Sequence, residues 1–159
     1  MADFNFVTTW RIDAPLPMVC DAIYHCLSWP TWWEGVENVE EIAPGDAAGI
    51  GSRLRFIWKG HLPYRLTFDI RVTSAVPLKS IEGQASGELV GIGCWQFSGD
   101  GPVSVVRYEW KVRTNRRWLN FISLIAKPLI RWNHDQVMRQ GGEGLARLLN
   151  ARLVSLAFG

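Results

Sequence analysis

Two neighbouring polar residues, Asn133 and His134, are the strongest candidates for chemistry in this sequence. A neutral imidazole offers one hydrogen-bond donor and one acceptor, and its usual pKa of about 6.5 suits a general acid or base. Arg55 and Arg139 could neutralise a carboxylate or an enolate on a bound molecule. The alternatives are a structural histidine within a helix and arginines that lie on the solvated surface.

Signatures of other reactions are incomplete. Residues 91–96 begin like a dinucleotide-binding turn, but Gln96 stands where the third glycine belongs. The residues that could hold zinc are scattered along the chain without the spacing of a metal site: His25, His61, His134, Cys20, Cys26 and Cys94. We therefore predict no metal and no cofactor.

Composition narrows the class of protein. The chain has 159 residues, and 17 Lys and Arg against 15 Asp and Glu give a net charge of +2, too small for a dedicated nucleic-acid binder. The length predicts a single domain over residues 1–159. The odd number of cysteines indicates a reducing compartment. The longest apolar run ends at Lys127 and Pro128, well short of a membrane span, so we expect a cytoplasmic protein without an integral membrane segment.

The elements that position Asn133 and His134 follow from hydrophobic periodicity. Apolar residues alternate over 4–12, which predicts a first strand. Asp13 and two prolines suit the start of a helix that reaches about Ser28. Residues 29–35 contain three tryptophans around a proline and end at a glycine, which suits a short second helix or a tight turn.

Six further strands are expected where turns rich in glycine or proline separate alternating segments: 36–42, 52–59, 64–76, 79–84, 88–98 and 103–114. Apolar residues alternate with charged ones in two of these strands, for example Phe68 with Asp69 and Tyr108 with Glu109. One face of the sheet is therefore expected to be apolar and the other solvated. The pattern predicts an α+β protein with a seven-stranded antiparallel sheet.

A long terminal helix is predicted from after Arg116 to about Val154, with a kink or break at Pro128. Asn133, His134 and Val137 lie on one side of this helix. The adjacent Gly141 and Gly142 each cost about 1 kcal/mol relative to alanine, so local distortion is expected there.

This order of elements resembles the helix-grip fold of the START and Bet v 1-like (SRPBCC) superfamily. Residues 29–36 are similar to the tryptophan-rich second helix of its polyketide cyclase/dehydrase branch, residues 44–52 to its glycine loop, and residues 128–138 to its terminal helix. The resemblance implies a curved sheet wrapped around the long helix, with a cavity between them that binds lipids, polyketides or other apolar molecules.

The mixture of large and absent side chains on the expected inner face also favours such a cavity. Large aromatic residues there would face the missing side chains of Gly141 and Gly144. The alternative is that the aromatic residues simply fill the core. The candidate ligand-binding residues are Trp33, Arg55, Trp58, Phe68, Tyr108, Trp110, Asn133, His134, Val137 and Gly141.

Three functions stay open on the sequence. The first is a protein that binds or carries a small apolar molecule, and the second is a cyclase or dehydratase that uses His134 as its acid or base. The third is a partner-binding module with an exposed tryptophan patch at Trp29, Trp32 and Trp33. The sequence leaves the ligand and the oligomeric state unassigned.

Overall fold

A computed structural model describes residues 3–114 and 117–159, and for residues 118–125 it describes the backbone only. The chain forms one eight-stranded antiparallel sheet with the order β2-β3-β4-β5-β6-β7-β1-β8. The strands are β1 (Asp3–Ile12), β2 (Val36–Ala43), β3 (Arg53–Trp58), β4 (Leu66–Val76), β5 (Ser80–Gly87), β6 (Leu89–Asp100), β7 (Val103–Thr114) and β8 (Leu153–Phe158). The α+β helix-grip architecture predicted from the sequence is confirmed.

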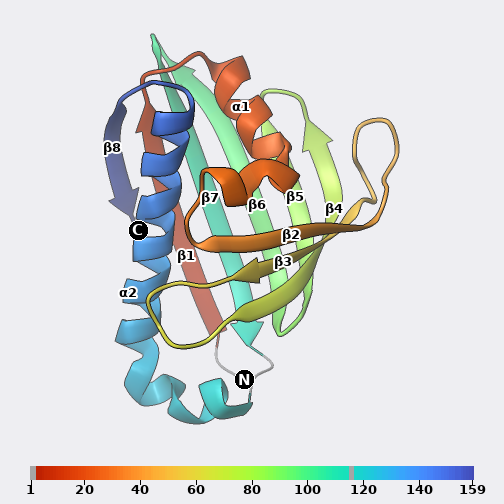
Figure 1. The fold of residues 1–159 in the computed structure, drawn as a ribbon, viewed down its shortest axis with the longest axis vertical. Coiled ribbons are helices and arrows are strands. Elements are labelled where there is room, and N and C mark those ends of the chain that lie inside the picture. Colours follow the sequence, from red (N-terminus) through yellow and green to blue (C-terminus); the bar gives the residue numbers. More distant parts are fainter. Residues whose placement is uncertain (1–2, 115–116) are drawn as a thin grey trace.

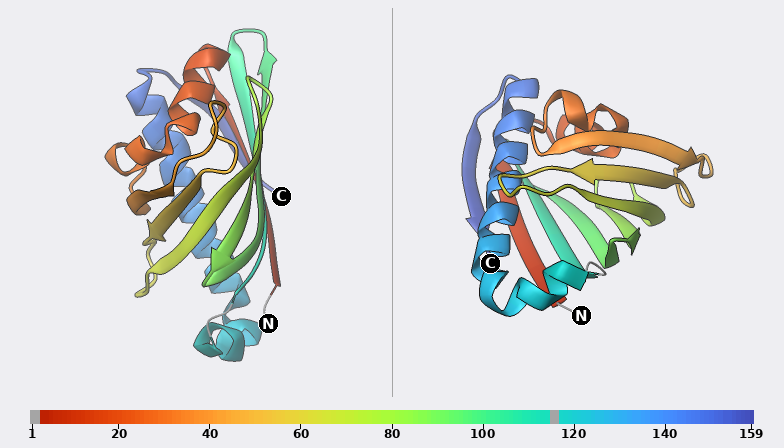
Figure 2. Two further views of the ribbon diagram at one scale, coloured as in Figure 1. Left: turned by 90° about the vertical axis from the view of Figure 1, so that its right-hand side faces the viewer. Right: turned by 60° about the horizontal axis from the view of Figure 1, so that its bottom comes forward.

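Three helical segments lie on the concave side of the sheet (Figure 2). They are α1 (Leu16–Tyr24), the 3₁₀ segment η1 (Cys26–Thr31) and α2 (Arg117–Leu148). Pro15 and Pro17 flank the start of α1, where an absent backbone N–H costs nothing. The predicted first helix is too long, because α1 ends at Tyr24 and a separate 3₁₀ turn carries the chain on to Thr31.

The predicted strand count and the predicted end of the terminal helix need correction. α2 ends at Leu148 rather than near Val154, and Leu153–Phe158 form β8, which pairs with β1. Asn150 adopts a left-handed conformation with φ 50°, which reverses the chain after the helix. The helix continues through Pro128, and its first turns run across the end of the sheet before it turns along β1 (Figure 1).

Strand alternation gives the sheet an apolar inner face. On β7, Val106, Trp110 and Val112 are buried and face inward, whereas Arg107 and Lys111 form surface ion pairs with Glu109. The inner face therefore forms the core, as the period-two pattern predicted.

Tryptophan residues form the centre of that core. Trp33 is fully buried and its ring contacts other indole rings at centroid distances of 4.9 to 6.2 Å. The rings in contact with it are those of Trp10, Trp29, Trp32, Trp58 and Trp95. The tryptophan-rich segment is thus an internal packing element, and the prediction of an exposed patch at Trp29, Trp32 and Trp33 is wrong. Aromatic pairing and area burial hold this segment inside.

Candidate functional site

A large cavity of about 560 Å³ lies between α1, η1 and the inner face of strands β3 to β6. Its floor is formed by apolar side chains of the sheet, including Leu54, Ile70 and Val72. Its roof comes from Ile23 and from Trp29, whose indole nitrogen donates to the carbonyl of Ile23 at 3.1 Å. That hydrogen bond satisfies the one polar atom of the ring and fixes its position.

Seven aromatic residues line this cavity: Tyr24, Trp29, Phe56, Trp58, Phe68, Trp95 and Tyr108. Trp95 and Tyr108 stack with ring centroids 4.1 Å apart. The Tyr108 hydroxyl lies above Gly93, where a Cβ atom would come within 2.8 Å of it. Glycine at this position therefore leaves room for a phenol inside the cavity, and burial raises the pKa of Tyr108 far above its usual value, so it stays neutral.

The mouth of the large cavity is bounded by the loop of residues 44–52, which follows β2. Asp46 organises this loop by accepting hydrogen bonds from the backbone N–H groups of Ala48 and Ile50 at 2.9 and 3.0 Å. The Tyr24 hydroxyl donates to the carbonyl of Ala48 at 2.8 Å and so ties the loop to α1. Gly49, with φ 84°, passes directly over that hydroxyl, which requires glycine for both its backbone conformation and its lack of a side chain.

A smaller cavity of about 110 Å³ lies beneath α2, between the helix and β1, β6 and β7. Asn133, His134 and Val137 line it from the helix, and Trp110 lines it from the sheet. The large cavity receives no residue from α2 among the described residues that line it. The smaller cavity lies where the sequence predicted one, between the sheet and the terminal helix, whereas α1, η1 and the loop of residues 44–52 enclose the large cavity.

His134 is largely covered by its neighbours, with 16% of its side chain exposed. Its ring stacks on Phe6 with centroids 3.9 Å apart, and its Nδ1 lies 3.4 Å from an Asp135 carboxylate oxygen. Burial lowers the pKa of His134, although the nearby Asp135 carboxylate opposes that shift. At neutral pH the imidazole is therefore uncharged and can both donate and accept a proton.

Asn133 links two elements. Its Oδ1 accepts hydrogen bonds from the backbone N–H groups of His61 and Leu62 at 2.7 and 3.2 Å. These residues lie in the connection between β3 and β4, so Asn133 fixes that connection against α2. Its amide oxygen is committed to the protein backbone, while its side chain still lines the smaller cavity.

Trp58, Phe68 and Tyr108 line both cavities and separate them. The indole nitrogen of Trp58 is buried and has no hydrogen-bond partner among the described residues. A buried unpaired N–H raises the free energy of this conformation, so an acceptor on a ligand beside Trp58 would be favourable.

Two predicted residues line neither cavity because they pack against each other. Trp33 donates from Nε1 to the carbonyl of Val137 at 2.8 Å, and a Cβ atom on Gly141 would come within 2.4 Å of its ring. A Cβ atom on Gly144 would likewise clash with the backbone carbonyl of Trp32. These glycines allow α2 to pack tightly on the tryptophans, and the open volume expected at Gly141 and Gly144 does not exist.

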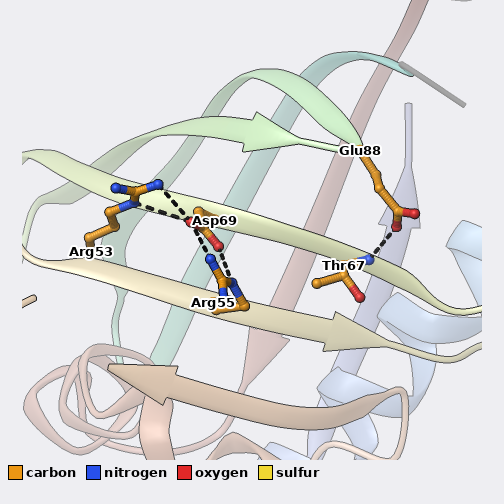
Figure 3. A network of polar contacts seen from close by, with 5 residues as sticks. All are labelled: Arg53, Arg55, Thr67, Asp69 and Glu88. Atoms are coloured by element: carbon orange, nitrogen blue, oxygen red, sulfur yellow. Dashed lines mark hydrogen bonds and ion pairs between the residues drawn. The ribbon is translucent and has the colours of Figure 1, made fainter. Parts of the chain in front are cut away.

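Arg55 lies on the outer face of the sheet, outside both cavities. It donates to the Asp69 carboxylate at 2.8 and 3.2 Å, and Arg53 donates to the same group at 3.1 Å (Figure 3). Asp69 is 7% exposed, so it forms a covered ion pair rather than the solvated pair that alternation predicts. Beside it, Glu88 accepts a hydrogen bond from the backbone N–H of Thr67 at 2.6 Å. Arg139 is exposed on α2.

Several residues of the large cavity were not predicted as ligand-binding residues. They include Ile23, Tyr24, Trp29, Leu54, Ile70, Val72 and Trp95. Inward alternation identifies Leu54, Ile70 and Val72 as core-facing, but periodicity does not distinguish a residue that fills the core from one that borders a cavity.

The described residues give no sign of metal or thiol chemistry. No group of three or more His, Cys, Asp or Glu residues in 3–114 and 117–159 could hold a metal ion. Burial raises the pKa of the Cys20 and Cys26 thiols to about 11, which disfavours the reactive thiolate. Across the helices that the structure describes, none has the length and apolar character needed to cross a membrane.

Comparison with solved structures identifies the fold. A START superfamily protein from Mycobacterium smegmatis matches with a TM-score of 0.74 at 10% identity, over 92% of this chain and 98% of that one. Zhui aromatase/cyclase from Streptomyces sp. R1128 matches with a TM-score of 0.66 at 14% identity, over 92% and 96%. The chain has the START and polyketide cyclase-like fold. No protein-family model and no curated protein sequence matches it.

A third structure shows that the START-like fold can be one part of a longer protein. The di-domain ARO/CYC BexL from the BE-7585A biosynthetic pathway matches with a TM-score of 0.71 at 21% identity. The match covers 94% of this chain and 51% of BexL, so the chain spans about half the length of that protein. At these identities the likeness concerns the fold.

Proposed function

We propose that the protein binds a small apolar molecule with aromatic character in the large cavity. The observation that carries this proposal is the cavity of about 560 Å³ with its aromatic and aliphatic wall, a size typical of ligand sites. Solved structures of START-like and aromatase/cyclase proteins share the fold, which supports a ligand-binding role.

The expected affinity follows from the apolar surface that a ligand would bury. About 300 Å² at roughly 25 cal/mol per Å² corresponds to about 7 kcal/mol before the costs of ordering. This figure suggests micromolar or weaker binding unless polar contacts add to it.

Native mass spectrometry of the purified protein, before and after denaturation, tests for a bound molecule. A mass that disappears on denaturation supports an occupied cavity and gives the size of the ligand. Binding of the fluorescent apolar probe N-phenylnaphthylamine provides a second measurement that does not require the natural ligand.

A pair of variants locates the probe. Val72→Trp places an indole in the large cavity, whereas Val105→Trp places the same side chain on the outer face of β7. We expect Val72→Trp to weaken probe binding at least about tenfold because it occupies the cavity, and Val105→Trp to bind normally. Equal binding by both folded variants would contradict the proposed site.

A second candidate function is acid or base catalysis by His134 on a polyketide-like substrate. The neutral, partly buried imidazole on the wall of the smaller cavity favours it. A cavity of about 110 Å³ is too small for such a substrate alone, so the substrate would also have to occupy the large cavity across the shared wall. His134→Ala would then abolish turnover of a poly-β-ketone analogue and leave probe binding intact, whereas a binding protein shows no turnover in either form.

A further inference from the structure

The large cavity carries a charge distribution unlike that of the whole chain. Among the described residues that line it, Glu41 pairs with inward-facing Leu54 and Asp46 lies in the loop of residues 44–52, and no lysine or arginine lines it. Glu82 also borders the cavity, but it pairs with Cys94, which pairs with Glu109 of the outer face, so its carboxylate lies outside. The chain as a whole has 17 Lys and Arg and 15 Asp and Glu. The cavity wall is thus acidic in a protein whose net charge is positive.

Strand geometry explains why the nearby cations stay out of the cavity. On β3, Leu54 and Phe56 are buried and face inward, while Arg53 and Arg55 alternate with them and face outward. Both arginines are held by Asp69 on the outer face. Neither can turn into the cavity without breaking its ion pair and crossing the sheet.

The interior of the cavity offers only neutral polar groups and aromatic faces. The Tyr108 hydroxyl lies above Gly93, and burial keeps it neutral. The ring faces of Trp29, Trp95 and Tyr108 carry partial negative charge, which attracts cations and repels anions. An anion placed there would lose its hydration without gaining a counterion, and that loss is costly.

We propose that the large cavity selects aromatic ligands that are uncharged or cationic and rejects aromatic anions. This inference rests on the proposed function, because it concerns the ligands of the same cavity. It assigns Glu41 as a specificity-determining residue that acts through its charge. Asp46 adds charge at the mouth, but it also holds the loop of residues 44–52 together.

Two fluorescent probes with the same ring skeleton test the selection. N-phenylnaphthylamine is neutral, and anilinonaphthalenesulfonate carries one negative charge. We expect the neutral probe to bind about tenfold tighter or more than the anionic probe. The ratio of the two probe affinities should shrink at high salt, because salt screens the carboxylates at the mouth. Competition should follow the same order, with naphthylmethylamine displacing the neutral probe at lower concentration than naphthoate.

A charge-neutral variant shows whether the Glu41 carboxylate is responsible. Glu41→Gln should reduce the ratio of the two probe affinities about twofold or more. The control is Glu143→Gln, which removes an exposed carboxylate from α2, a helix that contributes no described residue to this cavity. The control should leave the ratio unchanged.

The outcomes separate this inference from the proposed function. If the anionic probe or naphthoate binds as tightly as its counterpart, the charge selection is wrong while apolar ligand binding stands. The same holds if the ratio of the two probe affinities changes equally in Glu41→Gln and in the control. If neither probe binds and the purified protein carries no ligand, the proposed function itself is wrong, and the inference falls with it.

Discussion

Gly141 shows how a single absent side chain fixes the packing of α2. A Cβ atom there would come within 2.4 Å of the Trp33 ring, and the indole also donates to the backbone of the same helix at Val137. The ring thus lies directly on the helix backbone. Glycine lowers helix propensity by about 1 kcal/mol, and this close packing explains why it is tolerated at this position.

We predict that Gly141→Ala destabilises the protein by about 2 kcal/mol, although alanine favours the helix, because the fully buried Trp33 cannot move away. Urea unfolding measures the change. Glu143→Ala, an exposed substitution two residues along the same helix, should be close to neutral. A Gly141→Ala protein as stable as the parent or more stable would show that Trp33 can shift.

Asp69 gives the outer face a pH-dependent contribution to stability. The hydrogen bonds and charge of Arg55, with a further contribution from Arg53, hold the pKa of Asp69 below its usual value. A carboxylate with a lowered pKa in the folded state stabilises the protein above the pKa of the unfolded chain, about 4. That stabilisation is lost as the pH falls through the lower pKa of the folded state.

Asp69→Asn should therefore lower the free energy of unfolding at pH 7 by about 1 kcal/mol, a modest value because solvent screens the half-exposed arginines. The difference from the parent should shrink as the pH falls below the unfolded pKa of about 4 and through the lower pKa of the folded state. Urea unfolding across the acidic range measures it. A difference that stays constant with pH would show that packing rather than charge is responsible.

At the scale of elements, single side chains hold neighbouring segments in place. Asn133 fixes the connection between β3 and β4 to α2 through two backbone hydrogen bonds. Tyr24 fixes the loop of residues 44–52 to α1 through one. Both cavities therefore keep their shape through contacts between elements that are far apart in the sequence.

Asn133→Ala should destabilise the protein by about 2 kcal/mol, because it leaves the N–H groups of His61 and Leu62 without their acceptor. Hydrogen exchange at these two amides should accelerate. Asn133→Asp keeps an oxygen in place and should restore much of their protection. Unchanged exchange in Asn133→Ala would mean that the connection is held by other contacts.

At the scale of the whole molecule, two cavities share a wall of three aromatic residues. Trp58, Phe68 and Tyr108 border both, and Trp58 Nε1, which has no hydrogen-bond partner among the described residues, lies within this wall. Residues of the sheet and of all three helical segments line the two spaces. Ligand binding is therefore coupled to the stability of the entire fold.

A ligand that binds only the folded state should raise the free energy of unfolding. At a concentration of N-phenylnaphthylamine one hundred times its dissociation constant, the increase should be about 2.7 kcal/mol. Thermal unfolding with increasing probe measures it. Val72→Trp should show a much smaller increase at the same probe concentration, and an equal increase would place the bound probe elsewhere.

The sequence alone determined the fold class and the inner face of the sheet. Alternation along β4 and β7 reflects burial on one side of the backbone, and that pattern is local. The resemblance of residues 29–36, 44–52 and 128–138 to the START-like superfamily is confirmed at the level of the fold. The sequence did not reveal β8, because Leu153–Phe158 is short and follows directly on a helical pattern.

The tertiary structure decided which inward-facing residues border a cavity and which fill the core. Trp33 and Trp58 are both inward-facing tryptophans, yet Trp33 packs on Gly141 while Trp58 separates the two cavities. Arg55 and Phe56 are adjacent in the sequence, yet they lie on opposite faces of the sheet. Arg55 forms an ion pair on the outer face, and Phe56 lines the large cavity on the inner face. Such differences depend on contacts between distant segments, which periodicity along one strand does not encode.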